Sequence, residues 1–267
     1  MHYIKINQKN LRTDLILEQK NNIREESKYE ENNITVTNSR DNNYNYTTIY
    51  YKDITDKDNF LNTQKVLIRE LKKYINTKKE DKILVIGLGN NKSTPDSLGP
   101  NTVENILVTS HLFLLGDVEE GYSNVSSFIP NVMGNTGIET AKIIKSIIKD
   151  TKANKVIVID SLKTSNIKRL LKTIQITNRG ISPGSGIGNN RKEISKKTTG
   201  IDIIAIGIPT VVDINSIISN YTNKRIKGVD NLIVTPTNID YMIDKLSILI
   251  GNGINSSLHK NFIRQEK

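Results

Sequence analysis

The chain has 267 residues, no cysteine, three histidines and a net charge of +10, from 38 Lys and Arg against 28 Asp and Glu. The lack of cysteine excludes disulfides, a thiol nucleophile and zinc–thiolate sites, and it fits a reducing compartment. The length suits a single α/β unit with one large core, and the positive charge is compatible with a nucleic acid or an acidic protein as partner.

The first part of the chain, up to about residue 57, is polar and rich in asparagine. It contains two short β-type segments, Ile34–Thr37 and Thr47–Tyr51, separated by turn-prone residues. This pattern predicts an N-terminal arm followed by a peripheral hairpin. From Phe60 to Ile75 the apolar residues recur at helical intervals, which predicts an amphipathic helix before the main domain.

Short, continuous apolar runs indicate the central strands. Three of these runs are Ile83–Ile86, Val156–Ile159 and Ile203–Ile206, and Leu232–Val234 is a weaker fourth. Runs that are apolar at every position are typical of strands buried on both faces of a parallel sheet. We therefore expect four central strands, with loops that carry chemistry at their carboxyl ends.

Helical patterns lie between and after these runs. Thr136–Glu139 matches a capping box and is followed by an isoleucine stripe, a second helix starts near Pro100, and a last helix follows Pro236. Strands that alternate with helices predict an α/β fold with a mostly parallel central sheet and helices on both faces. We expect its core to span residues 82–250.

Two aspartates follow strands of this predicted sheet. Asp96 lies in the loop from Gly87 to Pro100, and Asp160 directly ends the second apolar run. If the two carboxylates are close and partly desolvated, they share one proton, so that one acts as general base and the other as general acid in peptide hydrolysis. The alternatives are structural, with Asp96 as a helix cap and Asp160 as an acceptor for loop amides.

A third loop, Ile181–Glu193, contains clustered glycines and two basic residues. Its backbone amides can bind an oxyanion, so Gly186, Asn189, Arg191 and Lys192 form a predicted substrate or oxyanion loop. A tight structural loop is the alternative. Neither glycine-containing loop has the full dinucleotide fingerprint between a strand and a helix, so we expect no nucleotide cofactor.

Several longer strings resemble the germination protease family of spore-forming bacteria. They cover most of residues 83 to 215 and are Leu84–Pro100, His111–Phe113, Val132–Thr140, Ile181–Ser195 and Ile204–Asp213. The resemblance implies a fold like that of hydrogenase maturation proteases and an aspartic-type endopeptidase with no required cofactor or metal. Members of this family start the degradation of small acid-soluble spore proteins during germination. By motif, the two proposed catalytic aspartates of the family correspond to Asp96 and Asp160.

The same resemblance implies a self-processing zymogen. Arg12–Glu18 is similar to the N-terminal segment of the family, in which a small residue and an acid precede an apolar residue. The cut is then expected between Asp14 and Leu15, which makes residues 1–14 a propeptide and residues 15–267 a single protease domain. A tethered, substrate-like segment has a high effective concentration at the site and can block it until it is cut. An ordinary polar arm is the alternative.

The resemblance also implies a homotetramer in the cytoplasm of the forespore or spore core, with no need for a membrane or nucleic acid. No apolar run approaches the roughly 18 residues of a membrane span, and the N-terminus lacks the apolar stretch of a secretory signal. The chain departs from the family in three places. Only about a dozen residues separate Ile218 from Leu232, where the family has a longer stretch. Ser110 stands where a basic residue is more usual, and Asn131 replaces a glycine. The shortening leaves the oligomer contacts open.

Two other functions remain open at this point. A metal-recognising protease of the hydrogenase maturation type would also need a histidine, and the chain has only His2, His111 and His259. His111 falls on an apolar helix face of the predicted fold, and we expect it to pack there or to cap a helix rather than bind a metal. A noncatalytic nucleic-acid-binding protein fits the charge, but an aromatic content of 5% and the lack of a known binding motif weigh against it.

Overall fold

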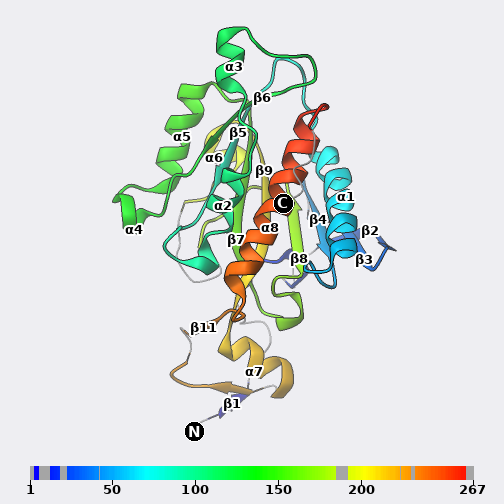
Figure 1. The fold of residues 1–267 in the computed structure, drawn as a ribbon. Helices are drawn as coiled ribbons and strands as arrows, with labels where there is room; N and C mark the ends of the chain where they lie inside the picture. The colour runs from blue at the N-terminus through cyan, green and yellow to red at the C-terminus, as the bar shows by residue number, and fades with distance from the viewer. Residues whose placement is uncertain are drawn as a thin grey trace.

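A mixed β-sheet runs through the whole molecule (Figure 1). The fold comes from a computed structural model, which describes residues 3–5, 13–18, 23–41, 43–184, 192–222, 224–229 and 232–262. Within these residues the sheet has nine strands in the order β2-β3-β4-β8-β9-β7-β5-β6, and β11 pairs with β9 outside this path.

One half of the sheet is parallel. β5 (Lys82–Gly87) lies between β6 (Asn124–Phe128) and β7 (Lys155–Thr164), and β7 pairs in parallel with β9 (Asp202–Asp213). β5, β7 and β9 contain the three strong apolar runs, so these predicted central strands are confirmed. β6 had no such run, because only one of its five residues is fully buried.

The other half of the sheet is antiparallel. It consists of β2 (Arg24–Glu31), β3 (Ile34–Asp41), β4 (Tyr44–Tyr50) and β8 (Thr173–Thr177), and β8 pairs antiparallel with β9. The predicted N-terminal hairpin is therefore present as β3 and β4, and β8 joins it to the main sheet. β9 is the seam between the two halves.

Helices cover both faces of the sheet, as predicted. α1 (Lys57–Tyr74), α2 (Leu98–Glu104) and α8 (Ile239–Leu258) pack on one face, and α5 (Thr140–Thr151) covers the other (Figure 1). Alternate residues of β5 enter two separate cores, the larger one beneath α1 and α8 and the smaller one beneath α5. None of the helices in the described part of the chain is long and apolar enough to span a membrane.

The remaining elements are short and lie mainly at the ends of the sheet. They are β1 (Tyr3–Lys5), η2 (Ile16–Glu18), η3 (Thr94–Asp96), α3 (Ser110–Leu115), α4 (Met133–Thr136), η4 (Ile167–Arg169), α6 (Lys196–Thr199), α7 (Ile214–Thr222), β10 (Lys224–Ile226) and β11 (Ile233–Val234). β1 pairs antiparallel with β10 next to α7, beyond the carboxyl end of β9 at the bottom of Figure 1.

Two of the predicted secondary-structure features are wrong. Leu232–Val234 is not a central strand, because β11 pairs only with the end of β9 and its side chains are exposed. Thr136–Glu139 is not a capping box. Gly137 takes the left-handed conformation, with a φ of 70°, and ends α4, so that α5 starts only at Thr140.

Candidate active site

Asp160 lies in β7 where its neighbour β5 stops. The last residue of β5, Gly87, pairs with Ile159, so Asp160 is the first residue of β7 without a partner on that side. On its other side β7 continues to Thr164 along β9, and the prediction that Asp160 ends its strand is therefore wrong. Asp160 is 6% exposed, and its Oδ1 accepts a hydrogen bond of 2.9 Å from the backbone N–H of Ser161.

Asp96 lies in η3, in the loop that leads from β5 to α2. The loop folds back on itself, because the N–H of Asn90 donates to the carbonyl oxygen of Asp96 at 2.8 Å. Only glycine fits opposite this carbonyl. Gly89 has a φ of +121°, and a Cβ there would lie 1.9 Å from the Asp96 oxygen. The hydroxyl of Thr210 on β9 donates to the carbonyl of Pro95 at 2.6 Å and ties the loop to the sheet.

The two aspartates line one small cavity of about 50 Å³. Close packing brings them there, since a Cβ on Gly99 would lie only 2.7 Å from the carbonyl oxygen of Ile159. Asn131, which sequence reasoning did not assign to the site, lines the same cavity. Its φ of 62° is left-handed, a conformation that asparagine tolerates better than most residues, and this explains why a glycine could stand at its position.

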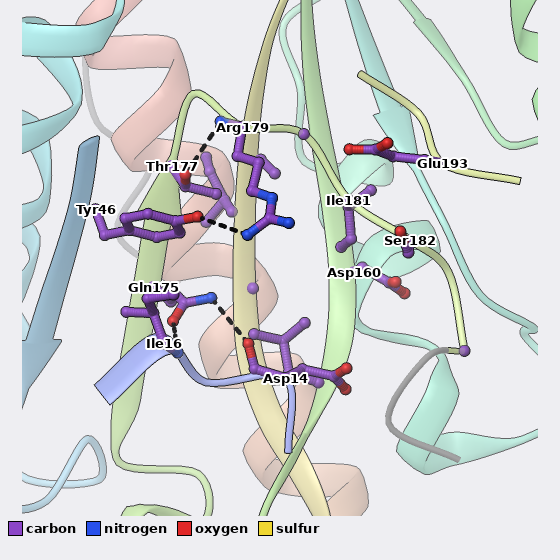
Figure 2. A pocket seen from close by; sticks show the side chains of 16 residues that line it. Asp14, Ile16, Tyr46, Asp160, Gln175, Thr177, Arg179, Ile181, Ser182 and Glu193 are labelled. Carbon is purple, nitrogen blue, oxygen red and sulfur yellow. Dashed lines mark hydrogen bonds between the residues drawn. The ribbon is translucent and has the colours of Figure 1, made fainter. Parts of the chain in front are cut away.

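A second cavity, of about 270 Å³, shares Asp160 with the first (Figure 2). Its opposite wall comes from the antiparallel half and includes Tyr46, Gln175 and Arg179, which sequence reasoning missed. Arg179 donates to the hydroxyl of Tyr46 at 3.3 Å and lies 3.7 Å from Asp41. Burial raises the pKa of Tyr46, with the hydrogen bond from Arg179 opposing this shift, so the phenol is neutral near pH 7.

The N-terminal segment 13–18 packs into the wall of this second cavity. The N–H of Asp14 donates to the carbonyl of Lys163 at 3.0 Å, and the N–H of Lys163 donates to the Asp14 carboxylate at 2.9 Å. Leu15 and Ile16 are only 1% and 3% exposed. Residues 13–18 are therefore an integral part of the folded structure, which does not fit the alternative of an ordinary polar arm.

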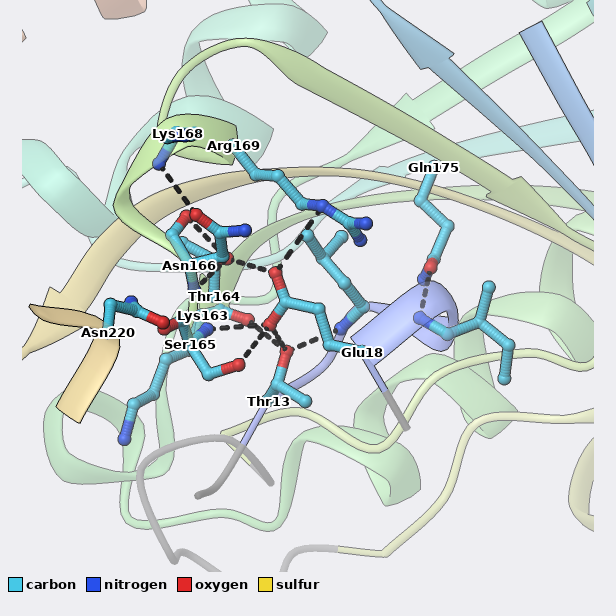
Figure 3. Close-up of polar contacts among 12 residues, drawn as sticks. Thr13, Glu18, Lys163, Thr164, Ser165, Asn166, Lys168, Arg169, Gln175 and Asn220 are labelled. Carbon is cyan, nitrogen blue, oxygen red and sulfur yellow. Dashed lines mark hydrogen bonds and ion pairs between the residues drawn. The ribbon is translucent and has the colours of Figure 1, made fainter. Parts of the chain in front are cut away.

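Glu18 anchors the end of this segment (Figure 3). Its carboxylate accepts hydrogen bonds from the hydroxyl of Thr13 at 2.6 Å, from the N–H and hydroxyl of Ser165, both at 2.7 Å, and from the hydroxyl of Thr164. The Nε of Arg169 lies 3.8 Å away. A carboxylate with this many donors holds the segment in a closed turn, because the Thr13 hydroxyl links the two ends of the segment.

The predicted oxyanion loop lies largely outside the described residues. Gly186, Asn189 and Arg191 belong to the part that the structure does not describe, whereas Lys192 is described and exposed. The two sides of the loop, at Gly184 and Glu193, line the cavity that contains Asp160. The loop therefore starts and ends beside the candidate site.

The two histidines that the structure describes lie away from this site. His111 is exposed on α3, so the prediction that it packs on an apolar face is wrong. His259 is buried at the end of α8, and its Nδ1 accepts a hydrogen bond of 3.2 Å from the N–H of Ser123. Burial lowers the pKa of His259. Among the described residues, no three or more His, Asp or Glu side chains are arranged to hold a metal ion.

Comparison with known proteins identifies one family. The model of the germination protease family matches residues 6–229. A germination protease from Geobacillus sp. (strain WCH70) is 50% identical over 183 residues, which cover 66% of this chain and 49% of that protein. The germination protease of Bacillus subtilis (strain 168) is 37% identical over 259 residues, with 72% of this chain and 70% of that protein covered. The chain thus matches from about half to about two thirds of the length of these relatives.

Among solved structures, a NiFe hydrogenase maturation protease, HycI from Thermococcus kodakarensis, aligns with 69% of this chain and 98% of its own. The TM-score is 0.39 and the sequence identity is 17%.

Proposed function

The chain belongs to the germination protease family, and from this membership we propose that it is an aspartic-type endopeptidase that starts the degradation of small acid-soluble spore proteins during germination. One observation supports this proposal above the others. Asp96 and Asp160, which come from separate loops and strands, line the same cavity.

In the proposed reaction the two carboxylates share one proton. The ionised partner accepts a proton from the attacking water, and the protonated partner donates its proton to the departing amine. Burial of Asp160 supports this division of roles, because a buried carboxylate does not ionise easily next to a second carboxylate in the same small cavity. The pair then titrates as a unit rather than as two separate groups.

The proposal includes self-processing between Asp14 and Leu15. Asp14 lines the same cavity as Asp160, and this shared cavity supports a processing site at Asp14. Glu18, on the C-terminal side of the Asp14–Leu15 bond, holds the segment through its hydrogen bonds with Ser165. The intact segment occupies the site and keeps the enzyme inactive until residues 1–14 are cut off.

The remaining parts of the proposal follow from the family. The enzyme requires no metal or organic cofactor, assembles as a homo-oligomer and acts in the cytoplasm of the spore. One loop is proposed to contact the substrate next to Asp160. It contains Lys192, together with Gly186, Asn189 and Arg191, which lie outside the described residues.

One assay tests the function. The wild-type chain, Asp96→Asn and Asp160→Asn are each incubated with a small acid-soluble spore protein, with and without a chelator, and the new N-termini are sequenced. We expect the wild type to cut after an acidic residue with or without the chelator, and neither variant to cut. Full cleavage by one variant would remove that aspartate from the mechanism, and loss of activity with the chelator would favour the metal-recognising protease.

A further inference from the structure

Gln175 is a buried residue of β8 that contacts the proposed cleavage segment with both ends of its side-chain amide. Its Oε1 accepts a hydrogen bond of 2.7 Å from the backbone N–H of Ile16. Its Nε2 donates to the carbonyl oxygen of Asp14 at 3.3 Å (Figure 2). This carbonyl belongs to the Asp14–Leu15 peptide bond, the one that the proposed processing breaks.

The orientation of this amide is determined by chemistry. The N–H of Ile16 can only donate, so the atom of Gln175 that faces it must be the oxygen. The nitrogen, which can only donate, is then directed at the Asp14 carbonyl, which can only accept. The other end of the same peptide bond is also held, because the N–H of Leu15 donates to the hydroxyl of Thr13 at 3.1 Å.

The register of the sheet places Gln175 and Asp160 opposite one residue of the seam strand. Both pair with Gly207 on β9, Asp160 from the parallel side and Gln175 from the antiparallel side. Directly paired residues have their side chains on the same face of a sheet, and Gly207 has none to place between them. The three residues line one cavity, which Asp14 also lines. A larger residue at position 207 would collide with Leu162, since its Cβ would lie 2.5 Å from that side chain.

We propose that Gln175 is a further catalytic residue, the hydrogen-bond donor that stabilises the negative charge on the carbonyl oxygen of the bond being cut. This inference rests on the proposed function. A water oxygen attacks the Asp14 carbonyl carbon, the carboxylate of the pair takes one water proton, and the C=O π electrons move onto oxygen, where Gln175 Nε2–H stabilises them. The electron pair on this oxygen then re-forms the C=O bond as the C–N bond breaks, and the nitrogen of Leu15 takes the proton of the second carboxyl group. The products are the Asp14 carboxyl group and the Leu15 amine.

The burial of Gln175 makes such a donor effective. The residue is only 8% exposed, so little water competes for the carbonyl oxygen, and the donor is already in place before charge develops. Removal of a single donor of this kind lowers kcat by about 10²–10³-fold in other hydrolases.

The test follows self-cleavage of the full-length chain. The first-order rate of appearance of a new N-terminus at Leu15 is measured by mass spectrometry for wild type, Gln175→Met, Gln175→Glu and Asp160→Asn. We expect Gln175→Met to be about 10²–10³-fold slower than wild type and Asp160→Asn to be inactive. Gln64→Met is the matched control, because Gln64 is also buried but lies in α1, and it should cut at the wild-type rate.

Gln175→Glu separates catalysis from simple docking of the segment. The carboxylate still accepts from the N–H of Ile16, so hydrogen exchange at that amide should stay slow, but an ionised Glu cannot donate to the Asp14 carbonyl. Its rate relative to wild type should therefore be low at neutral pH and rise as the pH falls and the carboxyl gains a proton. A residue that only docks the segment would show wild-type rates in Gln175→Glu at every pH.

Three results would overturn the inference. The first is cleavage by Gln175→Met at the wild-type rate, and the second is a pH-independent, wild-type rate in Gln175→Glu. The third is a wild-type chain that cuts a spore-protein peptide in an Asp160-dependent manner but leaves its own Asp14–Leu15 bond intact, in which case the endopeptidase function would stand without this role for Gln175. If neither bond is cut, both proposals fail.

Discussion

The two halves of the sheet make different contributions to the candidate site. The parallel half supplies Asp96 and Asp160, at the point where β5 ends and β7 continues. The antiparallel half supplies neutral and basic side chains, Tyr46, Gln175 and Arg179, which form the opposite wall. The groups proposed to move protons thus come from one half, and the side-chain amide that contacts the Asp14 carbonyl comes from the other, with β9 between them.

The largest effect should come from the parallel half. Asp96→Asn and Asp160→Asn should each slow peptide cleavage by at least about 10³-fold, because each removes one partner of a shared proton. The double variant should be no slower than the slower single variant, since the two groups act as a unit. Progress curves with a spore-protein substrate measure this. Losses that multiply in the double variant would show that the aspartates act independently.

A third aspartate at the same edge should act on stability instead. Burial alone would raise the pKa of Asp213, but hydrogen bonds from Lys163, at 2.9 Å, and from the hydroxyl and N–H of Ser216 lower it below its ordinary value. Asp213→Asn should cost about 3–5 kcal/mol at pH 7, because it leaves the buried ammonium of Lys163 without its partner.

The pH dependence of this effect has a definite sign. A carboxyl group with a lowered pKa in the folded state stabilises the protein above its unfolded pKa of about 4, and this contribution is lost as the pH falls through the lower, folded value. The stability difference between wild type and Asp213→Asn should therefore shrink below about pH 4. Urea unfolding at neutral and acidic pH measures it, and a difference that does not change with pH would contradict the assignment.

A core residue of the antiparallel half tests whether the two halves fold together. Ile174 in β8 is fully buried, and Ile174→Ala should cost about 2–5 kcal/mol through lost burial and the cavity left behind. Ile157→Ala in β7 is the matched change in the parallel half. Both variants should show one urea transition by circular dichroism and by tyrosine fluorescence. Separate transitions in Ile174→Ala would mean that the antiparallel half unfolds by itself.

The smallest effect concerns the helix that covers the antiparallel half. Asp56 caps α1, with its carboxylate accepting a hydrogen bond of 2.8 Å from the N–H of Asn59. Asp56→Ala should cost about 1 kcal/mol and lower the melting temperature by about 2–4 °C, while cleavage stays unchanged. Asp56→Asn keeps the acceptor and should restore most of this loss in calorimetry. An equal loss in both variants would show that charge, rather than the cap, matters.

The same contrast explains what could be predicted from the sequence. Strands buried on both faces by apolar packing have apolar runs, and these located β5, β7 and β9 and the aspartates beside them. β8 is equally buried, but its sequence TIQIT alternates apolar and polar residues, and two of the polar ones, Gln175 and Thr177, line the cavity. A local pattern cannot show that Gln175 will meet Ile16, since that contact joins residues far apart in the chain.

The contacts of the N-terminal segment were also beyond local reasoning. The resemblance indicated where the segment is expected to be cut. The contacts of Glu18, however, depend on Thr164, the last residue of β7, and on Ser165, which follows it. The false capping box has a similar origin. The four-residue pattern at Thr136 is correct in composition, but Gly137 stops the helix before the pattern can act.

The short pairing of β1 with β10 has a consequence for the timing of activation. Tyr3–Lys5 pairs with Lys224–Ile226, whereas Asp14 is bound by Lys163 of β7. A chain cut at the Asp14–Leu15 bond would therefore keep the cleaved N-terminal peptide bound. The peptide would leave only after it dissociates both from β10 and from β7. Scission and the onset of turnover would then be separate events, with a lag set by dissociation. Native mass spectrometry of freshly nicked protein would detect the retained peptide, and its immediate loss would argue against such a lag.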